Sequence, residues 1–229
     1  MQYPQNESLF PVDDQYMVGS DLLVKPVTSP GVVETTVKFP TDDVWYDAEQ
    51  LTEVYRSGVF QGSASFAEVK VPSDIDTIPV FQRGGSIIAR KLRLRRSSLL
   101  MKTDPYTLYV ALSASKTAKG SLYSDDEATF DHERKEEYIV SEFSADFNPK
   151  VAVIQNKATP GKGFEGLLTS MAGSNMIERI MIMGVEKAPT SIDVGGEALG
   201  FTYDRNTKVL TIRKPDVSSV IDWEIKITF

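Results

Sequence analysis

The stretch WEIKITF, residues 223–229, places an apolar side chain at every second position. Side chains of a β-strand point alternately to the two faces of its sheet, so this pattern predicts a strand with one buried and one solvated face. The stretch VETTVKF, residues 33–39, shows the same alternation, with Thr35 at one of the inward positions. Two distant parts of the chain are therefore expected to form strands of the same amphipathic kind.

Short apolar runs make up much of the remaining chain, and Gly, Pro, Asp or Asn separates most of them from one another. Many short strands divided by turn residues are typical of antiparallel β-sandwiches, so the fold class is predicted to be all-β. Only 13–23 and, less clearly, 47–57 have a spacing that suits a short helix. The further apolar runs lie at residues 108–112, 138–143, 151–154, 176–183, 191–194 and 209–212.

The sequence changes character near residues 97–105, where SSLLMKTDP follows a basic run and precedes the new strand pattern YTLYVALS. Pro105 restricts the residue before it to extended backbone and disfavours continuous regular structure there. We therefore expect one sandwich over 28–103 and a second over 104–229. The first 27 residues fit neither pattern.

Charge and composition exclude several classes of function. The chain has 229 residues with 25 Lys and Arg against 32 Asp and Glu, and this net charge of −7 disfavours binding to nucleic-acid backbones. No run approaches the roughly 20 apolar residues that a membrane helix needs, and no secretory leader opens the chain. Because Cys is absent and His132 is the single histidine, thiolate and multi-histidine metal sites are excluded.

Three acidic clusters are candidates for chemistry, at Asp13-Asp14, Asp42-Asp43 and residues 125–127. Paired carboxylates serve as general acids and bases or as Ca²⁺ ligands. The spacing of an EF-hand is not met, and Asp between strands usually bonds its own backbone, so a role in turns is favoured. His132 follows the third cluster and is interpreted as a surface residue, since no GxSxG motif supplies a nucleophile.

Three further features are candidates for binding. RKLRLRR, residues 90–96, suits an anion site, but in an acidic chain a solvated edge or ion pairs with a neighbouring domain are favoured. Trp45 and Tyr46 are of the type that stacks on sugars, although aromatic residues at strand ends more often belong to a core. Asn6 begins the sequon NES and is a candidate N-glycosylation site.

Several segments, taken in order, resemble the C-terminal part of family 31 glycoside hydrolases. DDQYMVGSDLLVKPV, residues 13–27, is similar to the segment that closes the (β/α)₈ barrel of that family. VWYD at 44–47 and IPVFQRGGSIIAR at 78–90 resemble strands of the sandwich that follows, and GSLYSDDEATFDHERKEEY at 120–138 resembles a turn of the second sandwich. The stretches QRGGSIIARKLRLRRSS and IRKPDVSSVIDWEI narrow the resemblance to the processing α-glucosidase II branch of the family. Glu127 departs from the family pattern, which usually has glycine there, so this turn is expected to differ in shape.

The resemblance implies two consecutive antiparallel β-sandwiches, proximal (28–103) and distal (104–229), preceded by the terminal barrel segment 1–27. It implies a parent enzyme of the endoplasmic-reticulum lumen that hydrolyses α-1,3-linked glucose from N-glycans, with retention and without metal or organic cofactor. Retaining hydrolysis needs two carboxyl groups about 5–5.5 Å apart. The W-x-D-M-N-E-like motif that carries the family nucleophile is absent from this sequence, so no catalytic residue is assigned.

The partners implied by the resemblance are the rest of the catalytic subunit, a regulatory β subunit and, through the parent enzyme, the N-glycan; neither nucleic acid nor membrane is expected. Two alternatives stay open: an independent carbohydrate-binding or scaffolding sandwich, and the same region of a family 31 α-glucosidase of other specificity. Residues 78–90 are expected to be central to the first sandwich, with Ile78, Val80 and Phe81 beside the pair Gly84-Gly85. The segment 1–27 is too apolar for a free tail and is expected to be covered by another chain.

Overall fold

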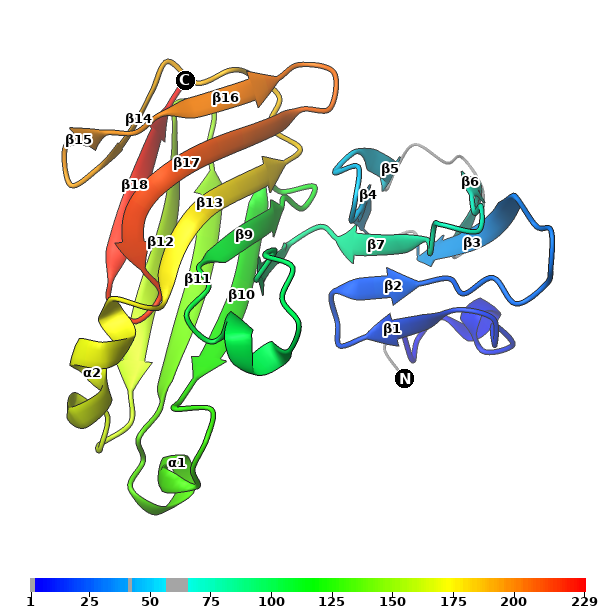
Figure 1. Cartoon of the computed structure of the whole chain (residues 1–229). Helices are drawn as coiled ribbons and strands as arrows, with labels where there is room; N and C mark the ends of the chain where they lie inside the picture. Colours follow the sequence, from blue (N-terminus) through cyan, green and yellow to red (C-terminus); the bar gives the residue numbers. More distant parts are fainter. Residues whose placement is uncertain (1–2, 41–42, 57–65) are drawn as a thin grey trace.

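The computed structural model describes residues 3–40, 43–56 and 66–229, and within these ranges the chain is mostly β with few helices (Figure 1). Figure 1 shows a small unit that contains β1 to β7 and the N-terminus, beside one large curled sheet that contains β8 to β18 and the C-terminus. The mostly β architecture expected from the alternating patterns is confirmed.

None of the helices in the described part of the chain has the length and apolar character needed to cross a membrane.

Two antiparallel sheets form the small unit. The first has five strands in the order β1-β2-β7-β4-β5, and the second pairs β3 with β6. A short 3₁₀ turn, η1 (Glu7–Leu9), precedes them. The strands are β1 (Tyr16–Val18), β2 (Leu22–Val24), β3 (Glu34–Pro40), β4 (Val44–Asp47), β5 (Glu53–Arg56), β6 (Phe66–Pro72) and β7 (Val80–Arg83).

Aromatic side chains from both sheets fill the core of the small unit. Phe39 of β3 packs edge-on against Phe81 of β7, with ring centroids 4.9 Å apart, and lies 5.7 Å from the ring of Trp45 in β4. All three side chains are fully buried. Because residues of both sheets share this core, the small unit has the layered arrangement of a β-sandwich.

The expectation of helices at 13–23 and 47–57 is wrong for the described residues. The first segment forms the hairpin of β1 and β2 around Gly19, which has a φ of +61°, and the second contains a turn and β5. The apolar triplets YMV and LLV are too short to show a period of two, and the GSD between them is the turn signal that fits a hairpin. Since β2 pairs with β7, 1–27 contributes strands to the small unit, and no barrel segment is evident in the described residues.

The large sheet has eleven strands in the order β15-β14-β18-β12-β11-β10-β8-β9-β13-β17-β16. The pairs β8–β10 and β9–β13 are parallel and the others are antiparallel, so the sheet is mixed where a purely antiparallel one was predicted. Its strands are β8 (Ser86–Arg90), β9 (Tyr106–Ala111), β10 (Thr117–Ser124), β11 (Ile139–Phe147), β12 (Val151–Pro160), β13 (Met176–Met183), β14 (Ser191–Val194), β15 (Glu197–Ala198), β16 (Phe201–Asp204), β17 (Val209–Ser218) and β18 (Trp223–Thr228).

The curl of the large sheet encloses a second, larger apolar core. Nine of its strands contribute fully buried side chains, among them Leu108 of β9 and Ile180 of β13. In β18 the predicted alternation of buried and exposed positions is confirmed. Three short helical turns join strands at the periphery: η2 (Ser98–Met101), α1 (Asp131–Arg134) and α2 (Glu165–Ala172).

Two glycines connect the small unit to the large sheet, because β7 ends at Arg83 and β8 begins at Ser86. The Gly84 N–H donates a 2.7 Å hydrogen bond to the carbonyl of Val44 in the small unit, and the Gly85 N–H donates one of 2.7 Å to Ala111 in the large sheet. A Cβ atom on Gly84 would lie 3.0 Å from Val44, and Gly85 has a φ of +92°, so close backbone approach at the first position and the left-handed conformation at the second both favour glycine. Sheet membership changes here, while the domain limits at 27 and 103 remain a proposal.

Candidate functional site

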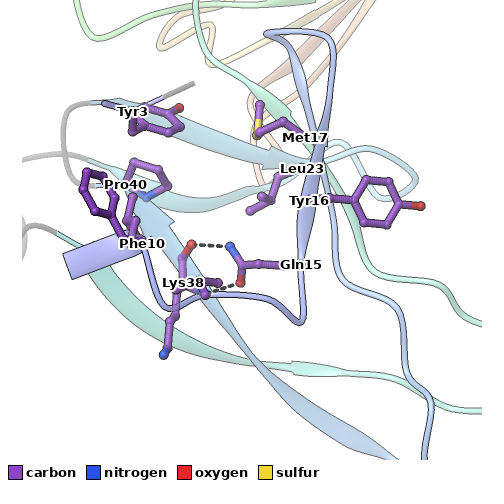
Figure 2. Close-up of a pocket in the computed structure, with 10 residues that line it drawn as sticks. Tyr3, Phe10, Gln15, Tyr16, Met17, Leu23, Lys38 and Pro40 are labelled. Atoms are coloured by element: carbon purple, nitrogen blue, oxygen red, sulfur yellow. Dashed lines mark hydrogen bonds between the residues drawn. The ribbon is translucent and has the colours of Figure 1, made fainter. Parts of the chain in front are cut away.

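An apolar pocket of about 190 Å³ opens between the N-terminal segment and β3 (Figure 2). Figure 2 shows Phe10 beside Pro40, and Tyr16 pointing away from the other labelled side chains. Phe10 and Tyr16 are 49% and 53% exposed, so two large rings of this surface remain open to solvent. The other lining residues are Tyr3, Leu9, Val12, Gln15, Met17, Leu23 and Lys38.

A side-chain amide holds the N-terminal segment against β3. Gln15 Nε2 donates a 2.8 Å hydrogen bond to the carbonyl of Lys38, and the Lys38 N–H donates one of 3.0 Å to Gln15 Oε1 (Figure 2, dashed lines). The amide pairs with β3 as the peptide group of a neighbouring strand would, so both backbone polar groups of Lys38 are satisfied. This pairing fixes one wall of the pocket.

A buried ammonium group, that of Lys25, forms an ion pair that holds the segment after β2 in place. The Lys25 side chain is almost fully buried and its Nζ donates a hydrogen bond to Asp14, while the Lys25 N–H donates one of 3.0 Å to the carbonyl of Pro79. The hydrogen bond from Lys25 lowers the pKa of the Asp14 carboxyl below its ordinary value. Asp14, a member of the first acidic cluster, is therefore held in an ion pair.

The chemistry of the pocket is that of a docking surface. Among its described lining residues there is no carboxylate, imidazole or aliphatic hydroxyl that would act as an acid, base or nucleophile. Met17 and Leu23 line the pocket and also pack on the aromatic core of the small unit, so this wall is held by that core. The arrangement suits the binding of apolar side chains from another protein segment.

A wider groove of about 1020 Å³ is lined by residues of the small unit together with β8 and β9. Three of the four carboxylates among its described lining residues serve local structure. Asp47 accepts hydrogen bonds from two backbone N–H groups of the turn that follows it, Glu53 pairs with Arg56, and Asp74 accepts a 3.2 Å hydrogen bond from the Asp76 N–H. These are the roles usual for acids between strands.

The basic run forms ion pairs with acids of the large sheet and of the segment that leads into β9. Arg95 donates hydrogen bonds of 2.9 and 2.6 Å to Asp104, whose side chain is only 2% exposed. Arg93 donates a 3.2 Å hydrogen bond to Glu178 of β13. The Arg95 guanidinium holds the pKa of the Asp104 carboxyl below its ordinary value.

The third acidic cluster forms a turn, as expected. Asp126 accepts hydrogen bonds from the N–H groups of residues 128 and 129 and from the Thr129 hydroxyl, which lowers the pKa of Asp126 to about 2. Glu127 has a φ of +57°, so this non-glycine residue adopts the left-handed conformation in the turn. His132 lies half-buried in α1, with Nδ1 3.7 Å from Asp125 Oδ2.

The remaining candidates do not assemble into a catalytic centre. Trp45 and Tyr46 are fully buried, so they belong to the core, as favoured above. Asp42 lies outside the described residues, and Asp43 pairs with Arg83. Asn6 is half-buried at the start of η1, and its glycosylation stays a prediction. Within the described ranges, no three His, Asp or Glu side chains are grouped closely enough to hold a metal ion.

Sequence reasoning did not locate the pocket, although it drew attention to the apolar residues of 1–27. Their number predicted that something covers this segment, but the wall opposite them is β3, which follows far along the chain. The hydrogen-bonded pair Gln15 and Lys38 is separated by 23 residues. No local spacing links two such positions, because the contact forms only where the N-terminal segment folds back onto β3.

Comparison with known proteins gives one family match and several relatives. Residues 1–88 match the family model described as the glycosyl hydrolase family 31 C-terminal domain. The chain is 39% identical to neutral alpha-glucosidase AB of Dictyostelium discoideum, over 99% of this chain and 23% of that protein. It is 37% identical to the human neutral alpha-glucosidase AB, over 98% of this chain and 22% of that protein. The chain therefore spans less than a quarter of the length of these relatives.

Solved structures show the same likeness in three dimensions. A glucosidase II alpha subunit crystallised with Glc1Man2 superposes with a TM-score of 0.79 at 28% identity, over 99% of this chain and 25% of that chain. An ER glucosidase II heterodimeric complex of a catalytic subunit and the binding domain of a regulatory subunit gives 0.76 at 27% identity, over 99% and 24%. A Flavobacterium johnsoniae family 31 dextranase gives 0.74 at 20% identity, over 99% and 28%, a likeness of fold alone.

Proposed function

This chain belongs to the C-terminal region of glycosyl hydrolase family 31, and on that premise we propose that it is a non-catalytic part of an α-glucosidase II catalytic subunit. The complete enzyme then removes α-1,3-linked glucose from N-glycans by a retaining mechanism. Identity of 37–39% to neutral alpha-glucosidase AB from two organisms, over almost the whole chain, supports this assignment. The likeness to the glucosidase II alpha subunit supports it from the fold.

The apolar pocket supports a structural role for the chain within that enzyme. Its lining offers rings and aliphatic groups, of which Phe10 and Tyr16 are about half exposed. An apolar surface of this kind is typical of an interface that another protein segment covers. We propose that the remainder of the catalytic subunit, including its barrel, packs on this surface, so that the chain supports the barrel from the side of β1 and β3.

The partner and the compartment follow from the same proposal. A relative has been crystallised as an ER heterodimer with the binding domain of a regulatory subunit. We place the present chain in the endoplasmic-reticulum lumen, as part of a catalytic subunit that binds such a regulatory subunit. The N-glycan would be bound by the catalytic barrel, and no metal or organic cofactor is required in this scheme.

Hydrolysis by the complete protein that contains this chain tests the enzymatic part of the proposal. We expect it to release glucose from an α-1,3-linked diglucoside faster than from an α-1,6-linked one, and we expect the isolated chain to release none. Faster hydrolysis of the α-1,6 linkage would assign a different family 31 specificity. Hydrolysis of an aryl α-glucoside by the isolated chain, free of contaminating enzyme, would contradict its non-catalytic role.

A further inference from the structure

Residues 91–102 form a compact loop between β8 and β9, which we call the 91–102 loop (Figure 1, green turn beside β9). Its two ends are tied together, since Lys91 Nζ donates a 3.0 Å hydrogen bond to the carbonyl of Lys102. The two hydrogen bonds from Arg95 to the buried carboxylate of Asp104 fix its middle. The loop is therefore held in one conformation by bonds to its own flanks and is not an unconstrained connection.

This fixed loop exposes four leucine side chains to solvent. Ten consecutive residues, 91–100, contain no buried position. The exposed fractions are 40% for Leu92, 99% for Leu94, 76% for Leu99 and 54% for Leu100. Single exposed apolar residues are common, but several gathered on one short ordered loop mark a surface that another molecule covers.

The leucines are interspersed with positive charge and no negative charge. Residues 90–102 contain six Lys or Arg and no Asp or Glu, in a chain whose net charge is −7. Arg93 and Arg95 keep about half and two-fifths of their side chains exposed although each is paired. Arg96 makes no ion pair with any described residue. Lys91 also pairs with Glu127, so the exposed guanidinium groups of Arg93, Arg95 and Arg96 are the part of the loop that would attract an acidic molecule.

We propose that the 91–102 loop is the docking surface for the regulatory subunit, and that the subunit presents an apolar patch bordered by carboxylates. This inference rests on the proposed function, because it takes its partner from the heterodimer formed by a relative. An apolar centre with a charged rim is typical of interfaces between separately folded proteins. Among the described lining residues of the N-terminal pocket, Lys38 alone is charged, so that pocket suits instead the remainder of the catalytic subunit.

Charge complementarity favours the regulatory subunit over a second copy of the chain as the occupant of this surface. In a symmetric dimer the same surface patch meets itself, so the five cations of one loop would face the five of its partner. Like charges brought together across an interface oppose binding. An acidic protein of different sequence avoids this repulsion, and the long-range attraction would speed its association with the loop.

Binding of the complete catalytic subunit to the regulatory subunit of the same organism tests the inference. We expect a Leu94→Asp, Leu99→Asp double variant to weaken the affinity at least about 10-fold, because it places carboxylates in the apolar centre. Arg96→Glu is expected to slow association and to reduce its dependence on salt. Ile75→Asp is the matched control, since Ile75 is equally exposed but lies in the small unit outside the loop, and it should bind as the wild type does.

Three results would overturn the inference, and they are distinguishable from one another. Wild-type affinity in the leucine double variant would show that the loop is not part of the interface. The proposed function would be unaffected by that result. A lowered melting temperature with unchanged affinity would show that the catalytic subunit itself covers the leucines. Failure of the wild-type subunit to bind any regulatory subunit, or to hydrolyse the α-1,3-linked diglucoside, would overturn the proposed function together with the inference.

Discussion

The hydroxyl of Tyr46, in the small unit, donates a 2.8 Å hydrogen bond to the carbonyl of Leu112, directly after β9 of the large sheet. Both residues are fully buried. Gly184, which follows β13, lies against the same phenol, so close that a Cβ atom there would be 2.3 Å from the Tyr46 oxygen. One side chain of the small unit therefore contacts two separate segments of the large sheet.

Removal of this hydroxyl is expected to destabilise the protein and to change its response to alkali. Tyr46→Phe should lower the free energy of unfolding by about 1 kcal/mol, the usual net value of one hydrogen bond. Burial raises the pKa of Tyr46, so above about pH 10 the phenol ionises in the unfolded chain before it does in the folded one. Stability contributed by Tyr46 is present below about pH 10 and is lost as the pH rises further.

Urea unfolding at neutral pH and at about pH 11 checks this prediction. The wild type should lose more stability than Tyr46→Phe between the two conditions. Some loss should remain in the variant, since burial also raises the pKa values of Tyr106 and Tyr203. An identical loss in both proteins would show that Tyr46 ionises equally in the folded and unfolded states.

A methyl group at Gly184 should disrupt the contact between Tyr46 and the large sheet. Gly184 has a φ of +84°, where a side chain is strained, and the new Cβ would clash with Tyr46. We expect Gly184→Ala to cost at least about 1–2 kcal/mol in thermal or chemical unfolding. Gly173→Ala is the control, since a Cβ atom there meets nothing within 4 Å. A double variant with Tyr46→Phe should cost less than the two single changes added together, because both act on one contact.

Truncation of Phe81 should be among the most damaging changes in the small unit. Its ring is buried against Phe39, so Phe81→Ala is expected to lower the free energy of unfolding by about 3–5 kcal/mol. Phe10→Ala removes a ring that is half exposed, and in the isolated chain it should change stability by less than about 1 kcal/mol. Equal melting temperatures for these two variants would contradict the assigned core.

The docking role of the N-terminal pocket predicts an effect that depends on the length of the protein. Tyr16→Asp should leave the melting temperature of the isolated chain nearly unchanged, because Tyr16 is half exposed there. In the complete catalytic subunit the same change should lower the melting temperature by several degrees, since it buries a carboxylate in an apolar interface. Val33→Asp, at an exposed site that is not among the pocket residues, serves as the control. Equal shifts in the short and complete proteins would refute docking at this surface.

Glycosylation at Asn6 can be measured directly on the complete protein made in a eukaryotic host. We expect an endoglycosidase-sensitive glycan on the peptide that carries Asn6, because the residue begins a sequon near the surface. Asn6→Gln and Ser8→Ala should each remove it, since the acceptor needs both positions. An unmodified mass for this peptide would reject the site, and the half-buried position of Asn6 in the turn before η1 would explain why.

The fold class was accessible from the sequence because alternation is a local signal. In β18 every inward position predicted from the pattern is buried or half-buried. The pattern is less exact at strand ends: Phe81 is buried and Val80 half-buried as expected, but Ile78 lies before β7 and is exposed. Apolar character alone does not tell where a strand begins, so the expectation for Ile78 was wrong.

Contacts between distant segments were not accessible in the same way. The parallel pair β9–β13 places Tyr106 opposite Ile177, and no spacing in the sequence predicts this pairing. The helix expected at 13–23 was wrong because pairing of β2 with β7 decides the conformation of that segment. The pocket lies where such long-range pairings meet, which is why the sequence indicated a covered surface but not its walls.

The glycine pair between β7 and β8 has a consequence for how such a protein can be altered by recombination. A connection of two residues is too short to accept a recombination junction. Each of the two glycines also donates a hydrogen bond to a different sheet. A gene fusion that exchanged only the part before residue 84 would also separate Tyr46 from Leu112 and Gly184. The two β-units are therefore expected to be inherited and transplanted together, as a single piece whose usable boundaries lie at its outer ends.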